Sequence, residues 1–166
     1  MHGTTTQTTH PEVVIIGFGN DLRGDDALGP MAGAFLQNLY EGRENIEVLI
    51  RTSLTPELAG VIAEAELVVF VDCAAEGPVG VVRQQQITIE STEQSMVHFL
   101  TPAALLAWTH QLFGRVPEAW TYSVAGLSFD ISEALTPPLQ AALPKLQQQV
   151  QGKVASFLQR PRPFRP

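Results

Sequence analysis

The sequence predicts a three-layer α/β fold, in which a mostly parallel sheet lies between helices on both faces. Strand-like and helix-like patterns alternate along the whole 166-residue chain. Residues 67–71 are all apolar, which is typical of a central strand in a parallel sheet. The length and the 45% content of apolar residues suit one domain. We therefore expect a single domain over 12–159, a flexible tail at 1–11 and a flexible Pro/Arg tail at 160–166.

Five segments have the composition of strands. An apolar run at 13–17 predicts the first strand, and similar runs at 46–50 and 67–71 predict the next two. Valine and isoleucine then alternate with polar residues over 79–89, which fits a strand at the edge of the sheet. The last strand is expected at 119–125.

Four helices are expected, at 27–40, 56–65, 102–113 and 138–158. Thr55 and Thr101 each precede a proline at the first position of a predicted helix, so we expect both threonines to be N-caps. Pro144 falls inside the last helix, where the ring of proline is expected to kink or restart it.

The predicted strand order brings two acidic segments together. Right-handed crossovers restrict the order of the first three strands, and the sheet reverses direction between the first and third if the first lies in the middle. Ligands collect at the carboxyl ends of strands at such a point. Asp25 and Asp26 follow the first strand and Asp72 ends the third, so we expect these carboxylates to share one cleft.

The turn after the first strand, residues 17–29, reads GFGNDLRGDDALG and is the most informative stretch of the chain. Its carboxylates could bind a cation, while its glycines let the backbone fold tightly beneath the ion. The alternative is an aspartate N-cap for the following helix. We assign Asp26 to the cation and Asp25 mainly to turn geometry and to the electrostatics of the helix N-terminus.

Asp72 and His98 are the other candidate ligands. A charge after the apolar run 67–71 is costly unless it is paired or bound to a metal, although capping of local N–H groups is an alternative for Asp72. His98 lies in a loop before the third helix, where a surface position is the alternative. Asp26, Asp72 and His98 together offer two oxygens and one nitrogen, which suits a first-row transition metal better than magnesium.

Several other classes of protein are disfavoured. The net charge of −7 argues against nucleic-acid binding, and no apolar run is long enough for a transmembrane helix. The first eleven residues do not resemble a signal peptide, so we expect a cytoplasmic protein. The single cysteine, Cys73, permits no internal disulfide and is expected to be a small buried residue with an inert thiol.

Known catalytic and nucleotide motifs are missing. The sequence contains no GxSxG or HExxH motif, and Leu22 occupies the position of the third glycine in a dinucleotide-binding turn. A Walker site is absent because the only lysines, Lys145 and Lys153, are far downstream. A phosphoacceptor receiver domain needs a lysine at the end of its last strand, where this chain has Ser123-Val124-Ala125-Gly126. We therefore rank the receiver as a minor alternative.

The pattern Gly17-x-Gly19-Asn20-x-Leu22-x-x-Asp25-Asp26-x-x-Gly29 resembles the signature of the [NiFe]-hydrogenase maturation endopeptidases. The resemblance extends from about Val13 to Leu158 and implies a twisted five-stranded sheet between helices. It implies that Asp26, Asp72 and His98 are both the metal-binding and the catalytic residues.

The resemblance also implies an activity, which is removal of a C-terminal extension from the hydrogenase large-subunit precursor after nickel insertion. Nickel would arrive with the precursor, and we expect no tightly bound metal in the resting enzyme. We expect a monomer whose partner is that precursor. A non-catalytic chaperone that binds the precursor is the alternative. Residues 51–58 depart from the Asp-Gly-Gly of many members and resemble the branch that serves bidirectional NAD(P)-coupled hydrogenases.

Overall fold

The computed structural model describes residues 10–89 and 100–161. It contains one five-stranded sheet with the strand order β2-β1-β3-β5-β4. The strands are β1 (Val13–Phe18), β2 (Ile46–Arg51), β3 (Leu67–Val79), β4 (Val82–Ile87) and β5 (Glu118–Ala125). β4 pairs antiparallel with β5, and the other pairs are parallel. The predicted fold class and the reversal between β1 and β3 are both confirmed.

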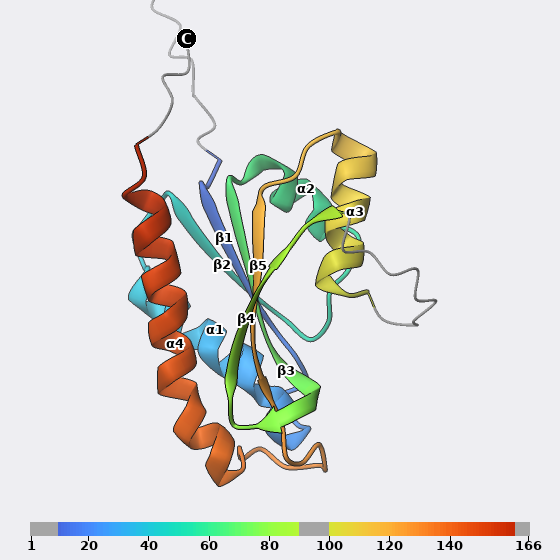
Figure 1. Cartoon of the computed structure of the whole chain (residues 1–166), viewed down its shortest axis with the longest axis vertical. Coiled ribbons are helices and arrows are strands. Elements are labelled where there is room, and N and C mark those ends of the chain that lie inside the picture. The colour runs from blue at the N-terminus through green and yellow to red at the C-terminus, as the bar shows by residue number, and fades with distance from the viewer. Residues whose placement is uncertain (1–9, 90–99, 162–166) are drawn as a thin grey trace, which may run out of the picture.

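Helices cover both faces of this sheet, as Figure 1 shows. A short 3₁₀ helix, η1 (Gly24–Ala27), leads into α1 (Leu28–Leu39), and the other helices are α2 (Leu58–Glu64), α3 (Pro102–Phe113) and α4 (Pro137–Leu158). One core cluster joins α1 and α4 to the sheet, and a second joins α2 and α3 to the opposite face. None of the helices in the described ranges is long and apolar enough to cross a membrane.

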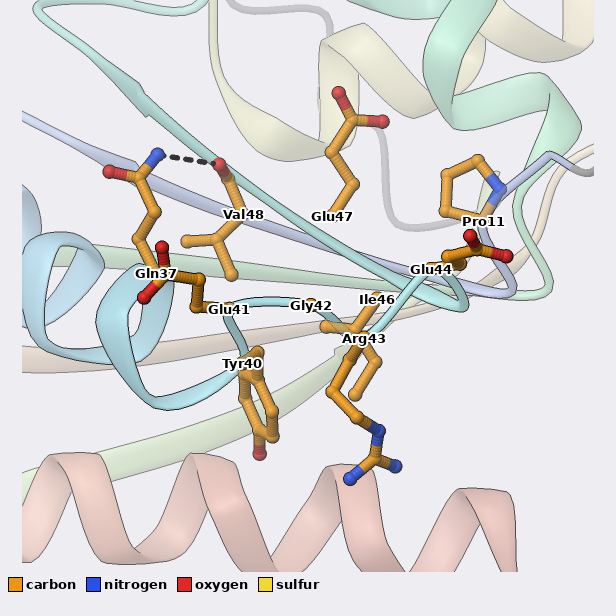
Figure 2. A pocket seen from close by; sticks show the side chains of 10 residues that line it. All are labelled: Pro11, Gln37, Tyr40, Glu41, Gly42, Arg43, Glu44, Ile46, Glu47 and Val48. Carbon is orange, nitrogen blue, oxygen red and sulfur yellow. Dashed lines mark hydrogen bonds between the residues drawn. The ribbon is translucent and has the colours of Figure 1, made fainter.

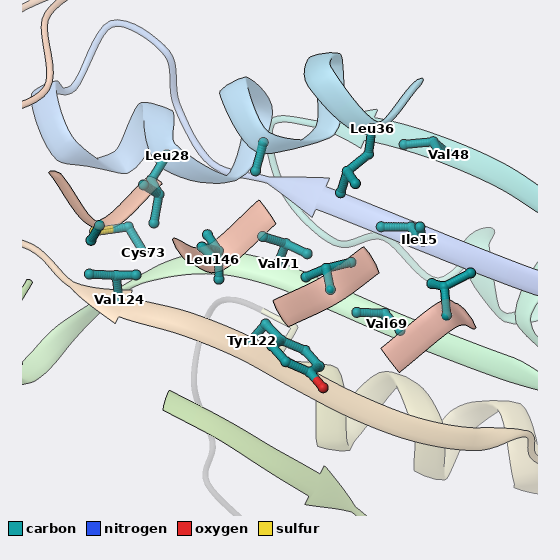
Figure 3. Packing of buried hydrophobic residues seen from close by; sticks show 14 of the residues in the cluster. Ile15, Leu28, Leu36, Val48, Val69, Val71, Cys73, Tyr122, Val124 and Leu146 are labelled. Carbon is teal, nitrogen blue, oxygen red and sulfur yellow. The ribbon is translucent and has the colours of Figure 1, made fainter. Parts of the chain in front are cut away.

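The buried faces of the strands explain the layers. Side chains alternate along a strand, so Val69, Val71 and Cys73 point toward α1 and α4, where they meet residues such as Leu28 and Leu146 (Figure 3). Val68 and Phe70 point to the opposite face and pack with the residues of α2 and α3. The central strand is therefore apolar on both sides, as the sequence predicted for 67–71.

Two of the predicted element boundaries are wrong at the third and fourth strands. β3 continues to Val79 because its second half pairs with β5, so Asp72 lies within the strand instead of ending it. Val79, which was assigned to the edge strand, closes β3, and the edge strand itself is shorter. The pairing of β1 with β3 stops at Val71, so Asp72 is the first residue of β3 beyond this pairing.

The helix starts also differ in one case. Thr101 is the N-cap of α3, because its Oγ1 accepts a hydrogen bond of 3.1 Å from the N–H of Ala104. The N-cap prediction for Thr55 is wrong, since its hydroxyl is hydrogen-bonded to the side chain of Glu57 and α2 begins only at Leu58. α4 runs through Pro144 without restarting.

Candidate active site

The turn between β1 and α1 packs closely against the end of β1 and against β3 at Val71. Gly29 lies so near both strands that a Cβ placed on it would be 2.1 Å from the carbonyl oxygen of Phe18 and 2.7 Å from that of Val71. Any larger residue at this position would push the helix away from the sheet. The glycines therefore fix the carboxylates of η1 at the carboxyl edge of β1 and β3, as the motif predicted.

Asp26 faces back across the turn. The backbone N–H of Asn20 donates a 2.7 Å hydrogen bond to Oδ2 of Asp26. Neither η1 nor α1 has a side-chain cap, so the N-cap alternative for the two aspartates is not what the structure has. Oδ1 of Asp26 accepts no hydrogen bond from the described residues, which leaves one oxygen of a correctly oriented carboxylate for another ligand.

Asp25 has a different role, which the sequence did not reveal. Its carboxylate is fully buried and accepts hydrogen bonds from the N–H groups of Leu127 (2.7 Å), Ser128 (3.1 Å) and Thr136 (2.7 Å) and from the Thr136 hydroxyl (2.7 Å). Burial alone would raise the pKa of Asp25, but these hydrogen bonds outweigh it and hold the pKa below its ordinary value. Asp25 thus ties the turn to the loop that precedes α4.

Two further hydrogen bonds clamp this loop to the turn. The N–H of Ser132 donates to the carbonyl of Leu22 at 3.0 Å, and the N–H of Gly24 donates to the carbonyl of Ser132 at 2.9 Å. The loop therefore joins the turn as one hydrogen-bonded unit. It carries Phe129 to the rim of the cleft that contains Asp26.

Asp72 shares this cleft with Asp26. The cleft has a volume of about 720 Å³ and lies at the reversal of the sheet, where β1 ends and its pairing with β3 stops. Burial and the nearby charge of Asp26 together raise the pKa of Asp72 to about 6. The predicted convergence of the two carboxylates at this edge is confirmed.

The cleft is lined from several elements: Phe18, Gly19, Asn20, Arg23, Asp26, Thr52, Ser53, Leu54, Asp72, Cys73, Ala75, Leu100 and Phe129. Residues 52–54 belong to the segment that departs from the Asp-Gly-Gly pattern, so this segment does face the site. Neither Arg23 nor Phe129 was singled out from the sequence. Arg23 lay within the motif, whereas nothing local marks Phe129, which comes from more than a hundred residues away.

His98 lies outside the described residues, and its assignment stays a prediction. Within 10–89 and 100–161, no group of three or more His, Cys, Asp or Glu side chains could hold a metal ion. Leu100, at the start of the next described segment, does line the cleft. The two aspartates offer hard oxygen ligands in one cleft, which fits part of a site for a divalent cation.

Cys73, which follows Asp72 in β3, is buried, as predicted. Burial, together with the charges of Asp25, Asp26 and Asp72, raises the pKa of its thiol to about 12. The thiol therefore stays protonated at neutral pH. A thiolate nucleophile at this position is disfavoured.

A second cleft, of about 460 Å³, lies at the other end of the strands, where β1 and β2 begin. Figure 2 shows it around the end of α1 and the start of β2, where the Gln37 amide donates to the Val48 carbonyl at 3.2 Å. The amino ends of parallel strands face this cleft. The site at the carboxyl ends is the better candidate, because ligands bind there in open α/β sheets.

Comparison with solved structures identifies the fold. Neither a protein-family model nor a curated protein matches the chain. The hydrogenase maturating endopeptidase HybD from E. coli superposes with a TM-score of 0.74, at 22% identity, over 88% of this chain and 93% of that one. The chain has the fold of the hydrogenase maturation endopeptidases.

Other structures with the maturation-endopeptidase fold are similarly distant. The [NiFe] hydrogenase maturation protease HycI from Thermococcus kodakarensis KOD1 has a TM-score of 0.68 at 23% identity and covers 88% of this chain and 93% of its own. A hydrogenase 2 maturation peptidase from Thaumarchaeota archaeon SCGC_AB-539-E09 has a TM-score of 0.66 at 21% identity, with coverages of 87% and 98%. The fold implied by the sequence resemblance is therefore confirmed.

Proposed function

We propose that this chain is an endopeptidase that removes the C-terminal extension of a [NiFe]-hydrogenase large-subunit precursor after nickel has been inserted. The observation that carries the proposal is the pair Asp26 and Asp72, which line one cleft at the reversal point of the sheet. The solved structures with this fold that are named as hydrogenase maturation proteases support it.

The two carboxylates have complementary roles in this proposal. Asp26 is oriented by the Asn20 N–H and presents its second oxygen, whereas Asp72 projects from the rigid central strand. Both would contact the nickel that the precursor carries, with His98 as the third ligand. Binding of the nickel would bring the scissile peptide into the cleft, so that cleavage would occur only after the metal has been inserted into the precursor.

Selectivity for nickel has to come largely from the precursor. Two carboxylates and one imidazole bind zinc or copper as readily as nickel, because affinities follow the Irving–Williams order. The folded metal site of the precursor would present nickel in a defined geometry and expose the tail. Free zinc is therefore expected to occupy the protease without switching on cleavage of a nickel-free precursor.

The test is incubation of the full chain with nickel-loaded and nickel-free precursor, followed by mass measurement of the large subunit. The proposal predicts loss of the extension only from the nickel-loaded form. Equal cleavage of both forms, or of neither, would contradict it. Association without any change in mass would instead identify the chain as a chaperone for the precursor.

A further inference from the structure

A polar groove continues the candidate site across the sheet toward its edge. Asp72 lies opposite Ser123 in the pairing of β3 with β5, and Ser123 lies opposite Arg83 in the pairing of β5 with β4. Side chains of directly paired residues share a face of the sheet. A row of three polar residues therefore runs from the cleft to the edge strand.

The groove at the end of this row has a volume of about 300 Å³ and is lined by Arg83, Gln84, Gln85, Thr121 and Ser123. The apolar core beneath α2 and α3 includes Ile87 and Ala119, which lie further along the same two strands. The described helices thus cover that part of the face and leave the polar part as a groove. Its lining offers hydroxyl, amide and guanidinium groups, which can hydrogen-bond an extended peptide.

Arg83 is the positive charge of this groove. Its side chain is exposed and forms no ion pair with a carboxylate of the described residues, in contrast to Lys153 and Arg160, which both pair with Glu118. Nη1 of Arg83 lies 3.2 Å from where a Cβ on Gly77 would be, and Gly77 has a φ of +118°, which favours glycine. A glycine therefore leaves the space that the guanidinium occupies.

The charges along this surface have opposite signs at its two ends. Asp26 and Asp72 lie in the cleft, and Arg83 lies two strands away from Asp72, at a distance of about 10 Å. An extended peptide covers such a distance in about three residues. A guanidinium binds a carboxylate through two parallel hydrogen bonds, so it favours an acidic group at that spacing.

We propose that Arg83, with Thr121 and Ser123, forms a subsite that binds a carboxylate of the C-terminal extension that is cut off. This inference rests on the proposed endopeptidase function and names a residue that determines its substrate preference. The carboxylate lies about three residues from the scissile bond. It is supplied either by an acidic side chain or by the C-terminus of the extension, which share the same chemistry.

The test compares Arg83→Gln and Arg83→Lys with a matched control, Arg115→Gln. Arg115 is also exposed, but it lies between α3 and β5, at the far end of the sheet from Asp72. Steady-state cleavage of nickel-loaded precursor gives KM and kcat. Fluorescence anisotropy gives the Kd of labelled peptides that span the extension, prepared with a free or amidated C-terminus and with acidic side chains changed to amides.

Loss of the guanidinium is expected to raise KM and the peptide Kd about tenfold, with kcat changed by less than about twofold. Arg83→Lys should retain part of the affinity, and Arg115→Gln should match the wild type. The peptide modification that removes the bound carboxylate should weaken binding to the wild type but have no further effect on Arg83→Gln. This comparison shows which source supplies the group.

Cleavage with the same KM in Arg83→Gln and Arg115→Gln would overturn the inference and leave the proposed function standing. If the wild type cleaves no precursor, the proposed function fails, and the peptide-binding measurements alone then test the Arg83 subsite. Binding that depends on both Arg83 and a peptide carboxylate would still support the subsite. Binding that is indifferent to either would overturn it.

Discussion

The carboxylate of Asp25 and the backbone and hydroxyl of Thr136 are joined by hydrogen bonds of 2.7 Å each, although 111 residues separate them in the sequence. Thr136 is also the N-cap of α4. One buried contact therefore connects the turn that carries Asp26 with the start of the closing helix. The stability of this turn therefore depends on Thr136, which does not line the candidate cleft.

Asp25→Asn is expected to lower the free energy of unfolding by about 3 kcal/mol, because the amide nitrogen would face N–H donors and leave buried groups unpaired. Thr136→Val should cost about 1–2 kcal/mol, because it removes only the hydroxyl. Urea denaturation measures both changes. In the double variant the two losses should not add, and full additivity would show that the residues do not interact.

The activities of the aspartate variants should follow a different order from their stabilities. Asp26→Asn is expected to abolish cleavage of nickel-loaded precursor while changing stability by less than about 1 kcal/mol, because among the described residues Asp26 accepts a bond only from Asn20. Asp25→Asn should retain more activity at a temperature where it is folded. The assay is precursor mass against time. Equal loss of activity in the two folded variants would contradict this order and would show that Asp25 takes part in the reaction.

Gly29→Ala is expected to destabilise the protein by about 3 kcal/mol or more, since its methyl group would overlap the carbonyl oxygens of Phe18 and Val71. Gly152→Ala is the matched control, because Gly152 is exposed within α4 and a Cβ there would meet nothing within 4 Å. The control should gain about 0.5–1 kcal/mol from helix propensity. Thermal and urea unfolding would measure both, and a neutral Gly29→Ala would refute the close approach of α1 to the sheet.

The lowered pKa of Glu118 predicts that the stability of the protein depends on pH. Partial burial raises its pKa, but hydrogen bonds from Arg160, Trp120 and Lys153 outweigh this effect and lower the pKa below its ordinary value of 4.5. A carboxyl whose pKa is lower in the folded state stabilises the protein above pH 4.5, and this contribution is lost as the pH falls through the folded-state pKa. Glu118→Gln should therefore cost about 1 kcal/mol at pH 7.

The difference between wild type and Glu118→Gln should shrink toward zero as the pH falls below 4.5 and through the lowered pKa of the folded state, because the wild-type carboxyl then also becomes neutral. Urea denaturation from pH 3 to pH 7 would follow it. A difference that stays constant over this range would mean that packing, and not the charge of Glu118, holds α4 to β5.

Local patterns predicted most of this architecture, and of the two errors one has a local cause and the other depends on a distant segment. The apolar run 67–71 and the Thr101 N-cap depend on neighbouring residues, and both were predicted correctly. Thr55 precedes a proline just as Thr101 does, but its hydroxyl bonds to Glu57, which the pattern does not reveal. The extension of β3 past Asp72 depends on pairing with β5, some fifty residues away.

Some features of the candidate site could likewise be predicted from local sequence patterns, and others could not. The positions of Asp26 and Asp72 were predictable because the glycine-rich turn follows β1 and Asp72 follows the apolar run of β3, and both lie at the reversal of the sheet. The role of Asp25 was not, since its partners lie in the loop before α4. The assignments of His98 as a ligand and of the chain to the bidirectional-hydrogenase branch stay predictions.

The central claim is that Asp26 and Asp72 act together on nickel held by the precursor. The most direct measurement is the affinity of the chain for nickel-loaded and nickel-free precursor, made with the wild type, Asp26→Asn, Asp72→Asn and the double variant. We predict that the wild type binds the nickel-loaded form more tightly and that either single substitution removes most of this difference, with little further loss in the double variant. If both single variants keep the full preference for the nickel-loaded form, the two carboxylates do not form the nickel-binding site.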